Sequence, residues 1–256
     1  MQKRDIFLMR PATHAGLFVD NPYCCHIIVL FIRFPSCLDW GEKMFEDRTD
    51  AGRKLALALE RYRDQNVLVL AIPRGGVEVG YQIAKHLNAD FSILVSRKLP
   101  YPYNPEAGFG AITEDGSIFI FPHAADNIPK QTIEQIIREQ EAELNRRIQA
   151  LRAGKALPKI KDRTVILIDD GIAMGSTMRA SIMLCKNKKA QKIIVASPVT
   201  GSNTAKEITA LVDEAIILET PRFFQAVAQV YANWYDVPDH EVVRILQKWE
   251  YEGGQF

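Results

Sequence analysis

Residues 165–177 read VILIDDGIAMGST, and this stretch decides the fold. Its first four residues are apolar, which is typical of a strand covered on both faces of a parallel sheet. Asp169 and Asp170 follow where the strand would end, and helical spacing predicts a helix over 177–186. Open α/β sheets bind ligands beyond the carboxyl ends of their strands. The stretch therefore predicts a ligand site at the two acids.

The loop between the acids and the predicted helix is suited to an anion. Small residues allow backbone N–H groups to approach a ligand closely, and the start of a helix attracts phosphate. The two carboxylates would accept hydrogen bonds from sugar hydroxyls. The pattern thus predicts a clamp for a sugar phosphate, with the phosphate held by Gly171, Ile172, Ala173, Met174, Gly175, Ser176 and Thr177.

Strand and helix patterns alternate on both sides of this stretch. The alternation predicts an open, mainly parallel sheet flanked by helices, a Rossmann-like core. Asp115-Gly116 between two apolar runs predicts a hairpin, and the prolines of 101–105 predict a loop. Further strands are expected at 67–72, 91–95, 193–196 and 215–218, and further helices at 50–62, 77–87, 130–152, 203–211, 223–231 and 239–249.

Composition is that of an ordinary soluble globular protein. The 256 residues are 47% hydrophobic and 25% charged, and they suit one large domain. The net charge of +1 gives no reason to expect nucleic acid or an acidic membrane as a partner. The four cysteines form no CxxC pair, so neither a zinc site nor a disulfide framework is indicated, and reduced thiols in a cytoplasm are expected.

Residues 1–43 differ from the rest of the chain. The apolar run 24–34 is shorter than the roughly 20 residues of a membrane span, and Arg33 interrupts it. No small-residue cleavage site of a secretory signal follows. We expect 1–43 to be an extension outside the core and 44–256 to be the main domain, although an extra strand or helix in 1–43 remains open.

The stretch 165–177 resembles the motif by which type I phosphoribosyltransferases bind 5-phosphoribosyl-1-pyrophosphate (PRPP). That motif has four apolar residues, two acids and a loop commonly ending Thr-Gly-x-Thr. Met174 stands where Thr is usual, which removes one hydroxyl donor. Ala173 stands where members acting on hypoxanthine or guanine carry Asp, so a 6-oxopurine acceptor is disfavoured. The resemblance covers about residues 47–220 and implies magnesium-dependent transfer of phosphoribose to a nitrogenous base, with release of pyrophosphate.

The resemblance also implies roles for individual residues. Asp169 and Asp170 would act on the ribose and reach magnesium through water rather than by direct ligation. Lys98, which with Arg97 opens the family's flexible loop, would be catalytic. Residues expected to bind pyrophosphate are Arg74, Gly75, Gly76, Arg97 and Lys98.

The acceptor side is less determined by the sequence. In the family a small, variable hood covers the acceptor, and residues 221–256 or 128–157 are the candidates here. The expected partners are small molecules, and the helix 130–152 is open to a role in the hood or in a homodimer. The alternative function is a regulatory protein that senses PRPP or a nucleotide without turnover.

Overall fold

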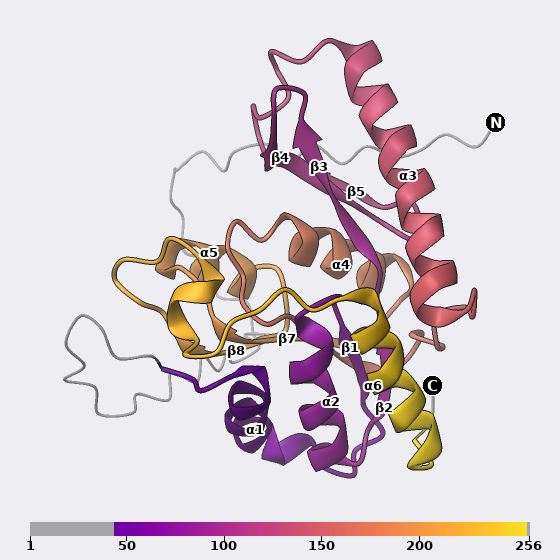
Figure 1. Cartoon of the computed structure of the whole chain (residues 1–256), viewed down its shortest axis with the longest axis vertical. Helices are drawn as coiled ribbons and strands as arrows, with labels where there is room; N and C mark the ends of the chain where they lie inside the picture. Colours follow the sequence, from indigo (N-terminus) through magenta and orange to yellow (C-terminus); the bar gives the residue numbers. More distant parts are fainter. Residues whose placement is uncertain (1–43, 255–256) are drawn as a thin grey trace, which may run out of the picture.

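The computed structural model describes residues 44–254, so the expected extension 1–43 lies outside the described residues. Five strands form one parallel sheet in the order β2-β1-β6-β7-β8, which confirms the mainly parallel sheet predicted from the sequence (Figure 1). The strands are β1 Leu68–Ala71, β2 Asp90–Ile93, β6 Thr164–Ile168, β7 Lys192–Val199 and β8 Glu214–Glu219.

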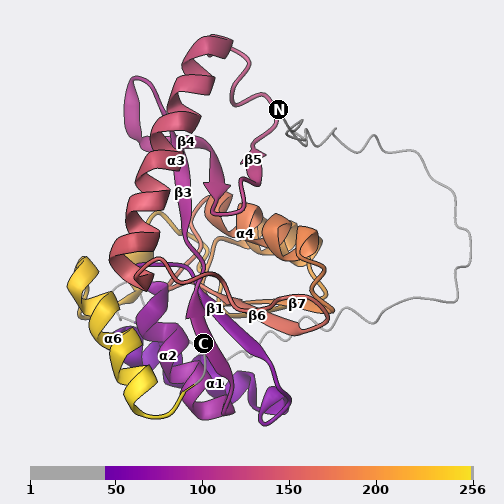
Figure 2. The same cartoon turned by 90° about the vertical axis from the view of Figure 1, so that its right-hand side faces the viewer.

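Helices cover both faces of this sheet, as Figure 2 shows. Side chains alternate between the faces along each strand. In β1, Val69 and Ala71 belong to a core shared with α1, α2 and α6, whereas Leu68 and Leu70 belong to a core shared with α4 and α5. The helices are α1 Arg48–Ala58, α2 Gly76–Leu87, α4 Ser176–Asn187, α5 Ser202–Thr209 and α6 Asp239–Tyr251.

A smaller antiparallel sheet forms a hood beside the parallel one (Figure 1). Its strands are β3 Ser96–Tyr101, β4 Asn104–Thr113 and β5 Ile118–Ile120, and α3 Lys130–Arg152 packs against it. Leu99 lies in a core with residues of α3, whereas Ala111 and Phe119 pack with Ala180 of α4. The small sheet is therefore covered by α3 on one face and by α4 on the other.

Two local predictions are wrong. The segment 101–105 was expected to be a loop, but it holds the end of β3 and the start of β4, because the tight turn needs only residues 102–103. The segment 223–231 was expected to be helical, but it contains only the short 3-10 turn Val227–Val230. Val227 of this segment packs against Gly171 in the loop after β6, whereas Phe223 is exposed, so its apolar residues form no single helical stripe.

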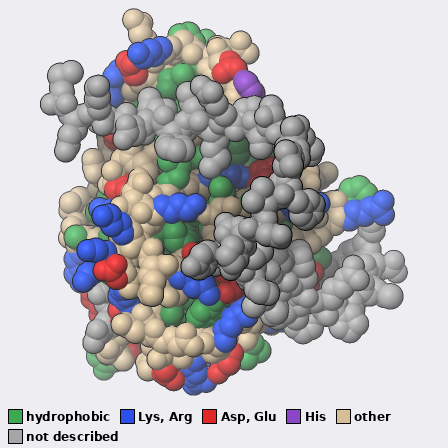
Figure 3. Space-filling model, turned by 180° about the vertical axis from the view of Figure 1, so that it is seen from behind, with side chains coloured by type: hydrophobic (Ala, Val, Ile, Leu, Met, Phe, Trp, Pro, Cys, Tyr) green, Lys and Arg blue, Asp and Glu red, His purple; other side chains and the backbone are tan. Residues whose placement is uncertain are grey.

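Charged side chains on the back of the molecule are mixed in sign where the described residues are visible (Figure 3). This agrees with the net charge of +1. No helix within residues 44–254 has the length and apolar character needed to span a membrane.

Candidate active site

The two acids after β6 have different surroundings. Asp170 is buried, and its Oδ2 lies 2.7 Å from Nε of Arg48. The Arg48 guanidinium also lies 4.0 Å from the ring centroid of Trp234, and the hydroxyl of Tyr231 donates to the backbone oxygen of Asp170 at 2.6 Å. The side chain of Asp170 is therefore held by the protein itself rather than presented to a ligand.

Asp169 instead lines a cavity of about 450 Å³. Burial, followed by the negative charge of Asp170, raises the pKa of Asp169 well above its usual range. A carboxylate in this position is poised to accept hydrogen bonds from hydroxyl groups, since within residues 44–254 its one protein donor is the backbone N–H of Asp170, at 2.9 Å. Of the predicted acid pair, the structure presents one member to the cavity.

The cavity brings together the loop after β6 and the hood. From the hood come Lys98 and Tyr101 of β3 and Phe121, which follows β5. The loop contributes Gly171, Ile172, Ala173, Met174, Gly175, Ser176 and Thr177, so all seven predicted phosphate-binding residues line it.

Three backbone carbonyls of the loop after β6 accept hydrogen bonds from side chains that do not line the cavity. The carbonyl of Ile172 accepts from the Thr200 hydroxyl at 2.6 Å, and that of Ala173 from the Thr204 hydroxyl at 3.2 Å. The carbonyl of Met174 accepts from a guanidinium nitrogen of Arg179 at 2.7 Å. In a trans peptide the C=O and the following N–H point in opposite directions. The N–H groups that follow these three carbonyls therefore face away from Thr200, Thr204 and Arg179, toward the cavity side.

We call these N–H groups, together with those of Ser176 and Thr177, the cradle of residues 173–177. Within the described part of the chain, the N–H groups of Ala173, Met174 and Gly175 donate to no protein acceptor. The amides of Ser176 and Thr177 belong to the first turn of α4, where no intrahelical acceptor exists. Gly175 has φ +75, a backbone conformation that glycine adopts without strain.

The predicted pyrophosphate loop after β1 lies directly against the acids. A Cβ added to Gly75 would be 1.8 Å from Oδ2 of Asp170, and one added to Gly76 would be 3.0 Å from the carbonyl oxygen of Ile168. Glycine is therefore required at position 75 so that the loop can approach the Arg48–Asp170 pair. The peptide bond between Pro73 and Arg74 is cis.

The three predicted basic residues do not gather in the cavity. Lys98 lines it and donates to the backbone oxygen of Glu106. Arg97 is the neighbouring residue in β3 and therefore lies on the opposite face, where its Nε donates to Gln140 of α3 at 3.2 Å. Arg74 lies 3.5 Å from Asp239 at the start of α6. Arg97 and Lys98 belong to a strand rather than to the flexible loop predicted from the sequence.

Sequence reasoning missed Arg48. The side chain of Asp47 accepts from the N–H of Asp50 at 2.8 Å and caps α1, which places Arg48 in the first turn. A charged residue at a helix start gives no signal of burial, and the 122-residue separation from Asp170 hides the pairing.

Aromatic residues of the candidate segment 221–256 meet at this arginine. Trp234 and Tyr235 are both partly exposed, and the backbone oxygen of Tyr235 accepts from Arg48 at 2.9 Å. Tyr235 also donates through its hydroxyl to Glu78. Burial raises the pKa of Tyr235 to about 12, and the hydrogen bond to Glu78 is the second cause of this shift. Phe223 is exposed and is not part of this group.

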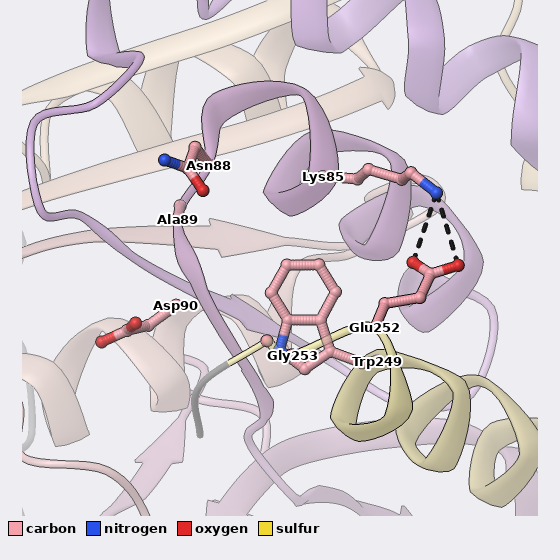
Figure 4. A pocket seen from close by; sticks show the side chains of 8 residues that line it. Lys85, Asn88, Ala89, Asp90, Trp249, Glu252 and Gly253 are labelled. Carbon is pink, nitrogen blue, oxygen red and sulfur yellow. Dashed lines mark hydrogen bonds and ion pairs between the residues drawn. The ribbon is translucent and has the colours of Figure 1, made fainter.

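A second cavity, of about 710 Å³, lies near the start of β2, away from the acids that follow β6 (Figure 4). Its charged side chains are paired with protein groups, since Lys85 lies 3.2 Å from Glu252 and Asp90 lies 2.7 Å from Arg163. Trp249 packs edge-on against Phe91. These contacts indicate a structural role.

The family follows from the comparison with known domains. The family model of the phosphoribosyl transferase domain matches residues 43–233. The chain belongs to this family. It is 36% identical over 208 residues to the Mycobacterium tuberculosis (strain H37Rv) protein named "Putative phosphoribosyl transferase Rv0571c". That match covers 80% of this chain and 47% of the relative, so the chain spans about half the relative's length.

A solved structure supports the same assignment. The crystal structure of TT1426 from Thermus thermophilus matches with a TM-score of 0.69 and 32% sequence identity. The match covers 80% of this chain and 98% of that one. The phosphoribosyl transferase domain thus supplies the parallel sheet, the acids after β6 and the cradle described above.

The donor set is compatible with magnesium bound together with a substrate. Mg²⁺ usually keeps several waters and binds one or two carboxylates plus substrate phosphates. Asp169 is the one of the two acids after β6 that lines the cavity, which Glu106 also lines, whereas Asp170 is engaged by Arg48. Among residues 44–254 no group of three His, Cys, Asp or Glu side chains is arranged to hold a metal alone. Any ion here would therefore depend on ligands supplied by the substrate.

Proposed function

We propose that this domain transfers the 5-phosphoribosyl group of PRPP to a nitrogenous acceptor and releases pyrophosphate. The observation that carries the proposal is the cradle of unpaired N–H groups at residues 173–177 next to the carboxylate of Asp169. A pentose 5-phosphate offers a matching arrangement, because its phosphate is an acceptor and its ring hydroxyls are donors.

Different residues of the cavity would contact different parts of PRPP. The cradle and the hydroxyls of Ser176 and Thr177 bind the 5-phosphate. Asp169 accepts from the ribose hydroxyls and stabilises positive charge that develops on the ring. Lys98, from the hood, approaches the leaving group from the opposite wall of the cavity.

In the transfer step the acceptor nitrogen forms a bond to C1 of the ribose. The bond from C1 to the pyrophosphate oxygen breaks, its electron pair leaves with pyrophosphate, and the acceptor nitrogen loses its proton to solvent water. Bound magnesium would offset the negative charge on pyrophosphate, with Asp169 reaching the ion through water. Gly75 and Gly76 of the loop after β1 lie beside the two acids, and Arg74 precedes them in the chain.

The Arg48–Trp234 stack is the proposed wall of the acceptor site. Trp234 is 38% exposed and lies against Arg48, the partner of Asp170, and an exposed aromatic ring offers a stacking surface for a planar base. Ala173 supplies no carboxylate for a proton exchange with the base, so a 6-oxopurine acceptor is disfavoured.

A regulatory protein that senses PRPP or a nucleotide is the second candidate. The lost hydroxyl at Met174 and the engagement of Asp170 by Arg48 favour it, because both reduce contacts to the sugar phosphate.

Turnover separates the two functions. The chain is incubated with PRPP, magnesium and a panel of nucleobases, and pyrophosphate release and product mass are measured. Release that depends on one acceptor, with a nucleotide of the corresponding mass, supports the transferase. Saturable PRPP binding without release across the panel supports the sensor, and the absence of PRPP binding overturns both.

A further inference from the structure

Arg179 of α4 lies behind the cradle and is not among the residues that line the cavity. It is 5% exposed, and one guanidinium nitrogen donates to the carbonyl of Met174 at 2.7 Å. Another nitrogen donates to the carboxylate of Glu207 in α5. The guanidinium carbon lies 5.5 Å and 5.3 Å from the ring centroids of Phe119 and Phe121 in the hood. The loop after β6, the hood and α5 therefore meet at this one side chain.

These contacts hold the guanidinium in place but neutralise its charge only in part. Phe119 and Phe121 pack edge-on with ring centroids 4.9 Å apart, and aromatic faces attract a cation. Burial lowers the pKa of Arg179, and the charge of Glu207 acts in the opposite direction. The side chain of Glu207 is 65% exposed, so water screens its attraction to the guanidinium. An anion bound at the cradle would therefore have a buried positive charge behind it.

The bond to Met174 also fixes one peptide of the cradle. The carbonyl of Met174 and the N–H of Gly175 belong to the same trans peptide, so they point in opposite directions. The carbonyl is bonded to Arg179, and the N–H donates to no acceptor within residues 44–254. A charged donor on the carbonyl polarises the peptide, which makes its N–H a stronger donor.

We propose that Arg179 is a positioning residue for the phosphate of the bound sugar phosphate. It directs the N–H of Gly175 at the anion and places a positive charge behind the cradle, without touching the ligand itself. The inference rests on the part of the proposed function that puts the 5-phosphate in the cradle. A planar guanidinium is suited to this role, because its fixed set of donors can reach Met174 and Glu207 at once.

Ribose 5-phosphate binding to the full chain, measured by calorimetry, tests the role. Arg179→Gln is expected to weaken binding about tenfold, the size of a lost charge-assisted interaction. Arg179→Lys is expected to lose less, because it keeps the positive charge. Arg163→Gln is the matched control. Arg163 likewise pairs with one carboxylate, of Asp90, and donates to one backbone carbonyl, of Val67, but it lies where β1 and β2 begin, at the opposite end from the cradle.

Thermal unfolding of each variant establishes that it is folded. Ribose 5-phosphate affinity that is the same in folded Arg179→Gln and in Arg163→Gln overturns the proposal. If Arg179→Gln does not fold, Arg179→Lys takes its place in the comparison, and an affinity equal to that of the control again overturns the proposal.

The backbone amide resonance of Gly175 distinguishes positioning from a general structural role. Saturation with ribose 5-phosphate is expected to shift this resonance in the unmodified chain and in Arg163→Gln. The shift is expected to be smaller in Arg179→Gln, because the N–H no longer points at the phosphate. A purely structural arginine would lower the unfolding temperature and leave the shift unchanged, and that result contradicts the proposal.

Pyrophosphate release separates this inference from the proposed function. Ribose 5-phosphate binding that depends on Arg179, with no release from PRPP across the panel of nucleobases, supports the positioning role and overturns the transferase. Acceptor-dependent release together with ribose 5-phosphate affinity that is independent of Arg179 supports the transferase and overturns the positioning role. Absence of ribose 5-phosphate binding in the unmodified chain overturns the positioning role whether or not pyrophosphate is released.

Discussion

Nε of Arg48 lies 2.7 Å from Oδ2 of Asp170, and both side chains are buried beneath Trp234. Because of this pair, the two acids that follow β6 have different surroundings. Asp170 joins the first helix to the centre of the sheet, and Asp169 is left to face the cavity. The proposed sugar-binding role therefore depends mainly on one carboxylate, rather than on the symmetrical pair that the sequence predicts.

Arg48→Ala is expected to destabilise the fold by about 3–5 kcal/mol, because it leaves a buried carboxylate without its partner. Urea unfolding measures the change. The double variant Arg48→Ala with Asp170→Asn should recover part of the loss, since no buried charge is then unpaired. Arg244→Ala is the control, because Arg244 forms an exposed pair with Glu241 that contributes about 1 kcal/mol or less. If the loss of unfolding free energy in the double variant equals the sum of the losses in Arg48→Ala and Asp170→Asn, the two side chains are not coupled.

Asp169→Asn is expected to stabilise the folded chain at neutral pH. The raised pKa means that the ionised form is less favourable in the fold than in the unfolded chain. The stability that Asp169 contributes is present below its unfolded pKa and is lost as pH rises through its folded pKa. The stabilisation by Asn should thus be largest at neutral pH and become smaller toward acid pH. Thermal unfolding measures it, since each kcal/mol corresponds to about 2–4 °C in Tm. A gain that grows as pH falls would contradict the raised pKa.

Met174→Thr is expected to tighten ribose 5-phosphate binding by about tenfold, because it adds a hydroxyl donor worth about 1.5 kcal/mol or more beside the cradle. Met174 is exposed, with 67% of its surface accessible, so the change should not disturb the core. Calorimetric titration measures the affinity, with Met174→Leu as a control that lacks a hydroxyl. Unchanged affinity in Met174→Thr would place the phosphate away from this position.

Gly75→Ala is expected to lower both stability and PRPP affinity, because its Cβ would overlap Oδ2 of Asp170 and crowd Nε of Arg48. Overpacking of this kind costs about 1–3 kcal/mol. Gly201→Ala is the matched control, since the nearest atom to its Cβ, in Phe224, is at an ordinary 3.6 Å. Thermal unfolding of both variants measures the difference, and a Gly75→Ala variant as stable as Gly201→Ala would contradict the close approach.

The strands and most helices could be predicted because their signals are local. The apolar runs of β1 and β6 and the helical spacing of α3 each lie within one segment, and α3 spans the predicted 130–152. The shared position of residues 171–177 along one cavity could be predicted for the same reason, since these residues are consecutive.

What could not be predicted depends on distant contacts. The burial of Arg48 requires Asp170, Trp234 and Tyr235 to meet around it. The separation of Arg97 from Lys98 requires knowing that both lie in a strand, because only a strand turns neighbouring side chains to opposite faces. The segment 223–231 has helix-compatible apolar residues, but its packing on the loop after β6 overrides them.

PRPP binding to Asp169→Asn tests the central claim most directly. Calorimetry with magnesium compares this variant with the unmodified chain and with Asp170→Asn, with thermal unfolding measured on each to establish that it is folded. The account predicts saturable binding to the unmodified chain and a loss of about tenfold or more in Asp169→Asn, the size of a lost charge-assisted hydrogen bond. PRPP affinity that is absent in the unmodified chain, or that is the same with and without the Asp169 carboxylate, would contradict it.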